Sequence, residues 1–222
     1  MRLSVSVGMV ALACASVVAQ EKSKLGGLLS AASDIKTAVA GLNPETVENL
    51  QAAYNGESNA SARYTAFAKK ADEEGYKSVA ALFRAASASE AIHAKRFAAV
   101  LQSGGIEAKA TSVKPVVGTT EENLKTAIAG ETKEFKDTYP KAVAAATKKG
   151  DAGAAKLFSD TLAVETKHAQ LFSEAAADLL TWREKGKTFL VCTTCGYTTT
   201  SSDSMKKCIL CALAREKFDT FK

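Results

Sequence analysis

The sequence predicts an all-α protein: a four-helix bundle with one long crossover connection, followed by a small C-terminal metal-binding domain. Four long segments have helical periodicity, and two of these share one internal pattern of glutamate and histidine. Residues 186–222, here called the annex, hold two C-x-x-C pairs. The 222 residues are 46% hydrophobic and 24% charged, which is ordinary for one sizeable core and a small additional domain.

The net charge of +5 is spread along the helical segments, with acidic residues interleaved. The chain has no run of basic residues and no alternation of basic and aromatic residues, the usual features of a nucleic-acid-binding surface. We therefore expect no nucleic-acid partner.

Residues 1–19 have the pattern of an export signal. Arg2 precedes an apolar stretch that ends at Val17-Val18-Ala19, and polar residues follow. This pattern predicts cleavage after Ala19 and a periplasmic or secreted mature protein. Two alternatives are an N-terminal helix that stays attached and lipidation at Cys14. No other segment is apolar and long enough to cross a bilayer, so we expect no membrane span in the mature protein.

Capping residues and helix breakers divide the rest of the chain. Residues 20–43 form an N-terminal extension, with a short helix expected around 25–40. Asn43-Pro44 is a helix start, Gly75 a helix end, and Pro140 a perturbation of the third helix. We expect helices at about 44–74, 76–102, 120–150 and 152–185, within a bundle domain at 44–185. The stretch 104–119 lacks a helical period and links parallel helices, which is the ferritin-like arrangement.

The second and fourth helices each have an apolar seam with a spacing of four and three residues. The two seams share the pattern Phe-x6-Glu-x2-His-x3-Phe, and the first and third helices also match, with "LQAAYNGES" beside "LKTAIAGET". The bundle is therefore interpreted as a duplicated helix pair. The seam residues are Val79, Phe83, Ala86, Glu90, His93, Phe97 and Val100, then Ala154, Phe158, Thr161, Glu165, His168, Phe172, Ala175 and Leu179.

Four glutamates fall on core-facing positions, and they would repel one another without a compensating cation. A glutamate and a Glu-x-x-His pair from each half form the ligand set of carboxylate-bridged di-iron or di-manganese bundles. Glutamate and histidine three residues apart share one helical face, so both can reach the same metal pair. The alternative is two core histidines that happen to follow glutamates. The predicted ligands are Glu57, Glu90, His93, Glu131, Glu165 and His168.

Three further residues lie near this predicted site. Glu134 follows Glu131 by three residues and is either a further ligand or a solvated glutamate at the edge of the seam. Tyr64 lies seven residues after Glu57, and Tyr139 lies eight after Glu131. Each tyrosine either donates a hydrogen bond to a ligand carboxylate or is an ordinary core aromatic residue.

The annex carries the spacing C-x2-C-x12-C-x2-C, formed by Cys192, Cys195, Cys208 and Cys211. Four thiolates give a tetrahedral site for zinc or for a single iron, and the spacing alone does not choose between them. A structural zinc ribbon is the interpretation for the annex in isolation. Beside a di-metal site that must be reduced again, a one-electron iron centre is the better hypothesis, and the annex would then receive electrons.

The chain resembles rubrerythrin over residues 46–222. The motifs that carry the resemblance are "NGESNASARYTAFAKKADEEGY", "SEAIHAKRF", "GETKEFKDTYP", "VETKHAQLF" and the rubredoxin-like "VCTTCGY". The resemblance implies a non-haem di-iron peroxidase that reduces hydrogen peroxide to water, with a rubredoxin-like C-terminal domain and a rubredoxin-like or reductase-like electron donor. It further implies His168 on one iron and an exchange of His93 and Glu134 on the other. Homodimers are usual, with the rubredoxin iron of one subunit near the di-iron site of the other.

Two departures and two rival functions remain. In Cys208-Ile-Leu-Cys211-Ala the usual proline and glycine are replaced, and a Cβ at a position that favours positive φ predicts strain of about 1 kcal/mol at Ala212. The export pattern is the second departure, because the family is mostly cytoplasmic. The rivals are a ferroxidase or iron-storage protein of the ferritin class, and a non-enzymatic metal-binding module with structural zinc in the annex.

Overall fold

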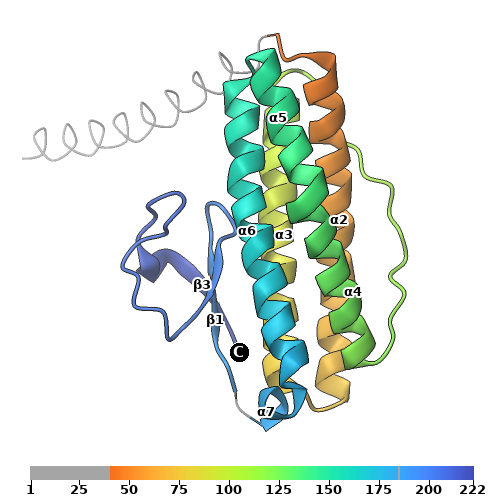
Figure 1. The fold of residues 1–222 in the computed structure, drawn as a ribbon, viewed down its shortest axis with the longest axis vertical. Helices are drawn as coiled ribbons and strands as arrows, with labels where there is room; N and C mark the ends of the chain where they lie inside the picture. The colour runs from red at the N-terminus through yellow and green to blue at the C-terminus, as the bar shows by residue number, and fades with distance from the viewer. Residues whose placement is uncertain (1–40, 185) are drawn as a thin grey trace, which may run out of the picture.

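The computed structural model describes residues 41–184 and 186–222 of the chain (Figure 1). The predicted export signal, Cys14 and the short helix expected around 25–40 lie outside these residues. Within the described part of the chain, no helix is long and apolar enough to cross a membrane.

Four helical rods form the bundle (Figure 1). Asn43 accepts a hydrogen bond from the N–H of Glu45 at the start of the first rod. The connection over residues 104–119 is not helical and runs along the outside of the bundle, so the second and third rods are parallel (Figure 1). The predicted ferritin-like fold class is confirmed. The rods are α2 (Pro44–Glu73), α3 (Lys77–Ser103), a composite third rod (Thr120–Lys149) and α6 (Ala152–Ala177).

The third rod is not one α-helix with a kink at Pro140. It consists of α4 (Thr120–Lys133), a π-helical turn η1 (Glu134–Thr138) and α5 (Tyr139–Lys149). Pro140 has no N–H to donate and its ring crowds the preceding turn, and the wider π turn immediately before it relieves both problems. A π turn inserts one extra residue, so Tyr139, eight residues after Glu131, faces the core as Tyr64 does seven residues after Glu57.

The predicted fourth helix, 152–185, is wrong at its end. The helix α6 stops at Ala177, because Asp178 has non-helical backbone angles (φ −140°, ψ 56°), and a separate short helix α7 (Leu179–Glu184) follows. The bundle core ends at this level. The change of direction buries Trp182, which stacks on Phe189 of the annex with ring centroids 6.0 Å apart. The helix α6 therefore ends early, and the chain gains the apolar contact between Trp182 and the annex.

The annex is a three-stranded antiparallel sheet that packs against the bundle (Figure 1). Its strands are β1 (Phe189–Cys192), β2 (Thr198–Thr200) and β3 (Phe218–Phe221), in the order β2-β1-β3, with a 3-10 turn η2 (Arg215–Lys217) before β3. Phe189 and Val191 are buried in the same apolar cluster as Phe83 and Phe172 of the bundle. The annex therefore shares a core with the helices.

The predicted seam residues line the interior. All are buried except Val100 and Leu179, which are half-buried.

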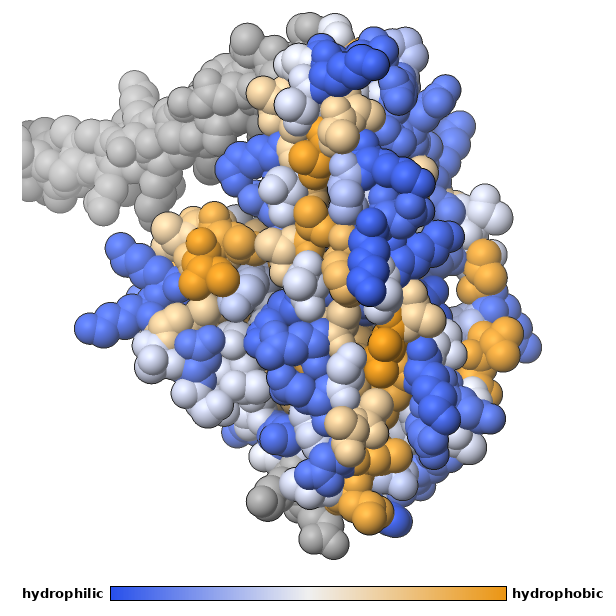
Figure 2. Space-filling model, viewed as in Figure 1, coloured by the Kyte–Doolittle hydropathy of each residue, from blue (hydrophilic) through white to orange (hydrophobic). Residues whose placement is uncertain are grey.

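The face of the bundle in Figure 2 carries hydrophilic residues on both sides of a narrow stripe of hydrophobic ones.

Candidate metal centres

Six side chains from four helical segments converge at the middle of the bundle. Their potential ligand atoms form two groups of four, and within each group all atoms lie within 4.8 Å of one another. Glu90 and Glu165 belong to both groups, so they are placed to bridge two metal ions. The first group is Glu57, Glu90, His93 and Glu165, and the second is Glu90, Glu131, Glu165 and His168.

Each histidine directs its Nδ1 atom at the two shared glutamates. His93 Nδ1 lies 2.9 Å from Glu90 Oε2 and 2.9 Å from Glu165 Oε1. His168 Nδ1 lies 2.9 Å from Glu165 Oε2 and 3.1 Å from Glu90 Oε1. The i, i+3 spacing places each pair on one face of its helix, so Nδ1 is the nitrogen available to a metal and Nε2 points outward from the cluster.

Aromatic layers close the cluster on both sides along the bundle axis. On one side Phe83 packs on Phe172, with ring centroids 5.2 Å apart, and Tyr64 lies against both. On the other side Phe97 packs on Phe158 at 5.6 Å. The residues are the two phenylalanines of each repeated pattern, brought together because α3 and α6 are antiparallel. They cover the cluster at its two ends along the bundle axis.

Tyrosine hydroxyl groups bind two of the carboxylates. Tyr64 donates to Glu131 Oε1, and Tyr139 donates to Glu57 Oε1. Tyr139 also stacks on Phe97, with ring centroids 6.2 Å apart, as part of the second aromatic layer. These hydrogen bonds hold one oxygen of each carboxylate and leave the other oxygen for a metal.

Burial and mutual repulsion of the carboxylates favour bound protons wherever no metal cation neutralises the cluster. Burial, followed by the charges of Glu90 and Glu165, raises the pKa of Glu57 to about 8. Burial also raises the pKa of Glu131 well above its usual value. For His168, burial lowers the pKa, but the Glu90 carboxylate and the hydrogen bonds to Glu165 and Glu90 outweigh it and raise the pKa to about 9. Two divalent cations would replace these protons.

The residues present fit a pair of iron ions. One oxygen of each of the four glutamates is buried and accepts no well-aligned hydrogen bond in the described part of the chain, although Glu90 Oε1 and Glu165 Oε1 each lie near a histidine Nδ1: Glu57 Oε2, Glu90 Oε1, Glu131 Oε2 and Glu165 Oε1. Buried carboxylate oxygens are normally paired or bound to metal. A donor set of carboxylate oxygens and two imidazole nitrogens suits iron or manganese.

Glu134 lies outside both groups of converging atoms, whereas His93 lies inside one. The residue Glu134 is half-buried, and it forms part of the wall of a small pocket beside Glu57. Burial, followed by the charge of Glu57, raises the pKa of Glu134 well above its usual value. The structure thus places His93, and not Glu134, among the converging atoms, and the exchange of the two that the resemblance implies stays a prediction.

The four cysteines of the annex form a second centre. Cys192 Sγ lies 3.4 Å from Cys211 Sγ, and Cys195 Sγ lies 3.5 Å from Cys208 Sγ. A tetrahedral site with metal–sulfur bonds of about 2.3 Å has sulfurs about 3.8 Å apart, close to both distances. A hydrogen bond with Cys195, together with backbone N–H groups, lowers the pKa of Cys192 to about 5 and favours the thiolate that a metal requires.

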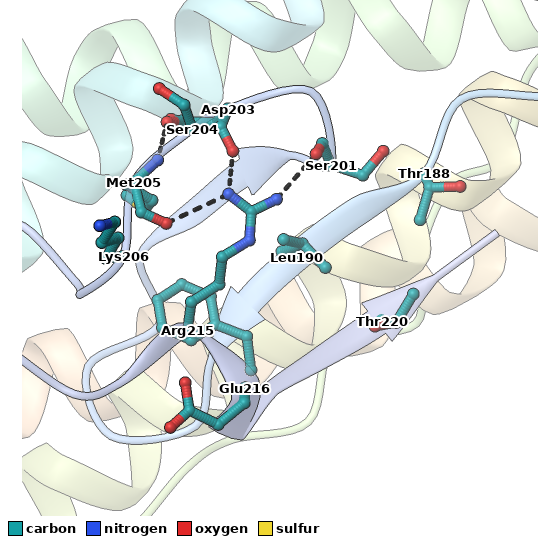
Figure 3. A pocket seen from close by; sticks show the side chains of 11 residues that line it. Thr188, Leu190, Ser201, Asp203, Ser204, Met205, Lys206, Arg215, Glu216 and Thr220 are labelled. Carbon is teal, nitrogen blue, oxygen red and sulfur yellow. Dashed lines mark hydrogen bonds between the residues drawn. The ribbon is translucent and has the colours of Figure 1, made fainter.

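The two C-x-x-C turns differ at the residue after the second cysteine. Gly196 has φ 82° and Ala212 has φ 59°. Ala212 is the one non-glycine residue with positive φ in the described part of the chain, which agrees with the predicted strain. Arg215, three residues after this turn, binds the segment 201–205 that precedes the second pair: its guanidinium donates to the carbonyls of Ser201, Asp203 and Met205 (Figure 3).

Replacing Ala212 by glycine is expected to stabilise the annex. The change removes the Cβ from a left-handed backbone position and should gain about 1 kcal/mol. Metal release from the four cysteines to a chelator should become slower. Ala214, at φ −64°, supplies the matched control: Ala214→Gly only adds freedom to the unfolded chain and should destabilise. Equal release rates for Ala212→Gly and the parent protein would contradict the strain.

The loop after the first C-x-x-C pair lies directly on the two metal-site histidines. The Ser89 hydroxyl donates to the Gly196 carbonyl at 2.7 Å, and His168 Nε2 lies 3.0 Å from Thr198 Oγ1. A Cβ added to Gly196 would lie 2.6 Å from His93 Nε2. This contact forms within one chain, whereas the resemblance implies a similar approach between subunits. Sequence reasoning did not find Ser89, Gly196 and Thr198 as contact residues.

Comparison with known proteins relates the chain to one family of metal-binding proteins. The family model described as Rubrerythrin matches residues 48–176. The chain is 35% identical to a rubrerythrin of Porphyromonas gingivalis, over 80% of this chain and 90% of that protein. It is 34% identical to a nigerythrin of Nitratidesulfovibrio vulgaris, over 85% of this chain and 90% of that protein.

Solved structures extend the comparison. Nigerythrin in its fully reduced, all-ferrous state matches with a TM-score of 0.71 and 33% identity, over 79% of this chain and 86% of that one. A bacterioferritin of Desulfovibrio desulfuricans matches with a TM-score of 0.59 and 20% identity, over 69% of this chain and 86% of that one. The second match concerns the fold alone.

Proposed function

Because the chain belongs to the rubrerythrin family of di-iron proteins, we propose that it is a non-haem di-iron peroxidase that reduces hydrogen peroxide to water. Each hydrogen peroxide takes up two electrons and two protons, its O–O bond breaks, and two waters form. The four cysteines would hold an iron, which when bound would accept electrons one at a time from a rubredoxin-like or reductase-like donor protein. The irons in the bundle, when bound, supply the two electrons and polarise the peroxide.

The contact between the annex and the metal-site histidines is the observation that carries this proposal. Ser89 and Gly196 join the first C-x-x-C loop to α3 one turn from His93, and Thr198 meets His168. A protein that only oxidises and stores iron has no use for a one-electron centre at this place. Reductant-driven turnover requires such a connection.

The chain's own residues shape the rest of the chemistry. The aromatic layers cover the two ends of the cluster, and the glutamates and histidines are buried, so their charges act in a medium of low dielectric constant. The hydroxyl group of Tyr64 donates a hydrogen bond to Glu131, and that of Tyr139 donates one to Glu57. They keep these carboxylates oriented and place a hydroxyl proton beside the cluster.

Glu134→Ala is expected to slow oxidation of the reduced protein by hydrogen peroxide about tenfold, because it removes the carboxylate proposed to bind the oxidised iron. Single-turnover absorbance after mixing with peroxide measures the rate. Lys133→Ala, on the neighbouring exposed position, is the control and should behave as the parent. If Glu134→Ala keeps the parental peroxide rate, and the parent oxidises ferrous iron with dioxygen faster than with peroxide, the ferroxidase alternative is correct.

We also propose that the protein is exported, on the pattern of residues 1–19. The expected mature N-terminus in the native host is at or near Gln20. N-terminal sequencing of protein from that host measures it. A chain that still begins with Met1 would overturn export, and a lipid on Cys14 would replace simple release by anchoring. Without export, the cytoplasm is the expected location.

A homodimer is proposed on the family resemblance and on the hydrophobic stripe in Figure 2, a surface of the kind that subunit contacts bury. Sedimentation equilibrium of the metal-loaded protein should give the mass of two chains. A mass of one chain at micromolar concentration would contradict the dimer and leave the contact between annex and bundle within the chain unaffected.

A further inference from the structure

A small pocket connects the protein surface to the metal-ligand carboxylates. It has a volume of about 110 Å³ and lies where α2 faces η1 and the start of α5. Ala52, Gly56 and Thr138 line it and are exposed, so they form its mouth. Glu57 and Tyr139 also line it and are buried, so they form its floor. We call this the Gly56 pocket.

The floor of the Gly56 pocket is part of the metal cluster. Glu57 is 1% exposed, and its Oε2 atom has no hydrogen-bond partner in the described part of the chain. Its other oxygen, Oε1, accepts the hydrogen bond from Tyr139. Glu134 stands in the pocket wall between mouth and floor and is half-buried. A small molecule that enters the mouth therefore meets Glu134 and then the cluster.

Gly56 keeps the mouth open. It lies in the interior of α2, where glycine is the least favourable residue other than proline. Neither left-handed backbone nor crowding requires it, because no positive φ is recorded for it and an added Cβ would meet nothing within 4 Å. A side chain at this position would project into free space at the mouth. The mouth of the Gly56 pocket is open because this side chain is absent.

The duplicated half of the bundle has an arginine at the corresponding place. Gly130 precedes Glu131 as Gly56 precedes Glu57. Beside Gly130, however, lies the guanidinium of Arg63, with Nη2 3.9 Å from the position of an added Cβ. Arg63 also lies over the Tyr64 ring, 5.2 Å from its centroid. The residue that corresponds to Arg63 before Tyr139 is Thr138, which is short. We therefore expect access from the Gly56 side.

Resting on the proposed function, we infer that the Gly56 pocket is the route by which hydrogen peroxide reaches the di-iron site, and that the missing side chain at Gly56 keeps this route open. A cavity needs about 10–15 Å³ to hold one water molecule, so a pocket of about 110 Å³ has room for hydrogen peroxide.

Gly56→Leu tests the route by filling the mouth. We expect oxidation of the reduced protein by hydrogen peroxide to be at least tenfold slower than in the parent. Azide, a linear three-atom probe, should bind the oxidised protein with an association rate lowered by a similar factor, as followed by the change in iron absorbance. Gly56→Ala adds only a methyl group and should remain close to the parent. Thr138→Leu narrows the mouth from the other side and should act in the same direction as Gly56→Leu.

Gly130→Leu is the matched control, because it makes the same change on the side covered by Arg63, and it should keep parental rates with peroxide and azide. Parental rates in both Gly56→Leu and Thr138→Leu, with parental melting temperatures, would overturn the route. Equal slowing in Gly130→Leu would overturn its one-sidedness. If the parent instead proved to use dioxygen, the proposed peroxidase function would fail, but Gly56→Leu should still slow azide binding.

Discussion

Cys208→Ser is expected to abolish the colour of the annex and nearly abolish reductant-driven peroxide turnover. Cys208 is buried and its Sγ lies 3.5 Å from Cys195 Sγ, so its loss removes one of four converging thiolates. A hydroxyl is a poor ligand for a site that selects soft metals. Turnover with a continuous supply of reductant should fall on the order of 100-fold, because electrons no longer reach the bundle.

The same variant should keep the di-iron chemistry itself. A single addition of peroxide should still oxidise the reduced bundle at the parental rate, because the cluster of glutamates and histidines is unchanged. Thiolate-to-iron charge-transfer absorption measures the annex, and metal analysis of natively loaded protein should give about three irons in the parent chain and two in the variant. Thr194→Ser, an exposed position within the first C-x-x-C pair, is the control.

The outcome also decides between iron and zinc in the annex. A colourless parent with one zinc per chain, and a Cys208→Ser variant that turns over peroxide normally, would show a structural zinc site. In that case the peroxidase would receive its electrons elsewhere. Native metal loading matters here, because four thiolates bind either metal.

The bundle and the convergence of its glutamates and histidines could be predicted because residues a few positions apart on a helix determine both. Glu90 and His93 are three residues apart, so helical geometry alone places both on one face, and the same holds for Glu165 and His168. The duplication then brings the two faces together. The eight-residue spacing from Glu131 to Tyr139, against seven in the first half, was a visible sign of the π turn, but a proline in the same stretch offered a simpler explanation.

The contacts that connect the two centres could not be predicted in this way. Ser89 and Gly196 are separated by 107 positions in the chain, and no periodicity relates a helix to a loop of the annex. The end of α6 at Ala177 depends on the same docking, since Trp182 turns toward Phe189. Whether the annex meets its own bundle or that of another chain is a matter of tertiary packing, which single-sequence patterns do not record.

Gly196→Ala is expected to separate the two metal centres while leaving each intact. The new Cβ would lie 2.6 Å from His93 Nε2 and 2.7 Å from Ser89 Oγ, and both of these residues are buried. The loop must therefore move outward, and the hydrogen bond from Ser89 to the Gly196 carbonyl is lost. A displacement of about 1 Å in a positioned site can slow a reaction up to about 100-fold, so we expect electron transfer from annex to bundle to be at least tenfold slower.

Stopped-flow reduction of the oxidised bundle, after rapid reduction of the annex iron, measures this step. Gly196 also has φ 82°, so part of the effect on stability comes from the backbone alone. Gly150→Ala isolates that part, because Gly150 has φ 80° and an added Cβ would meet nothing within 4 Å. It should lower the melting temperature and leave electron transfer unchanged. If Gly196→Ala retains its annex iron and transfers electrons at the parental rate, the loop on His93 is only a packing contact, and electrons reach the bundle by another path.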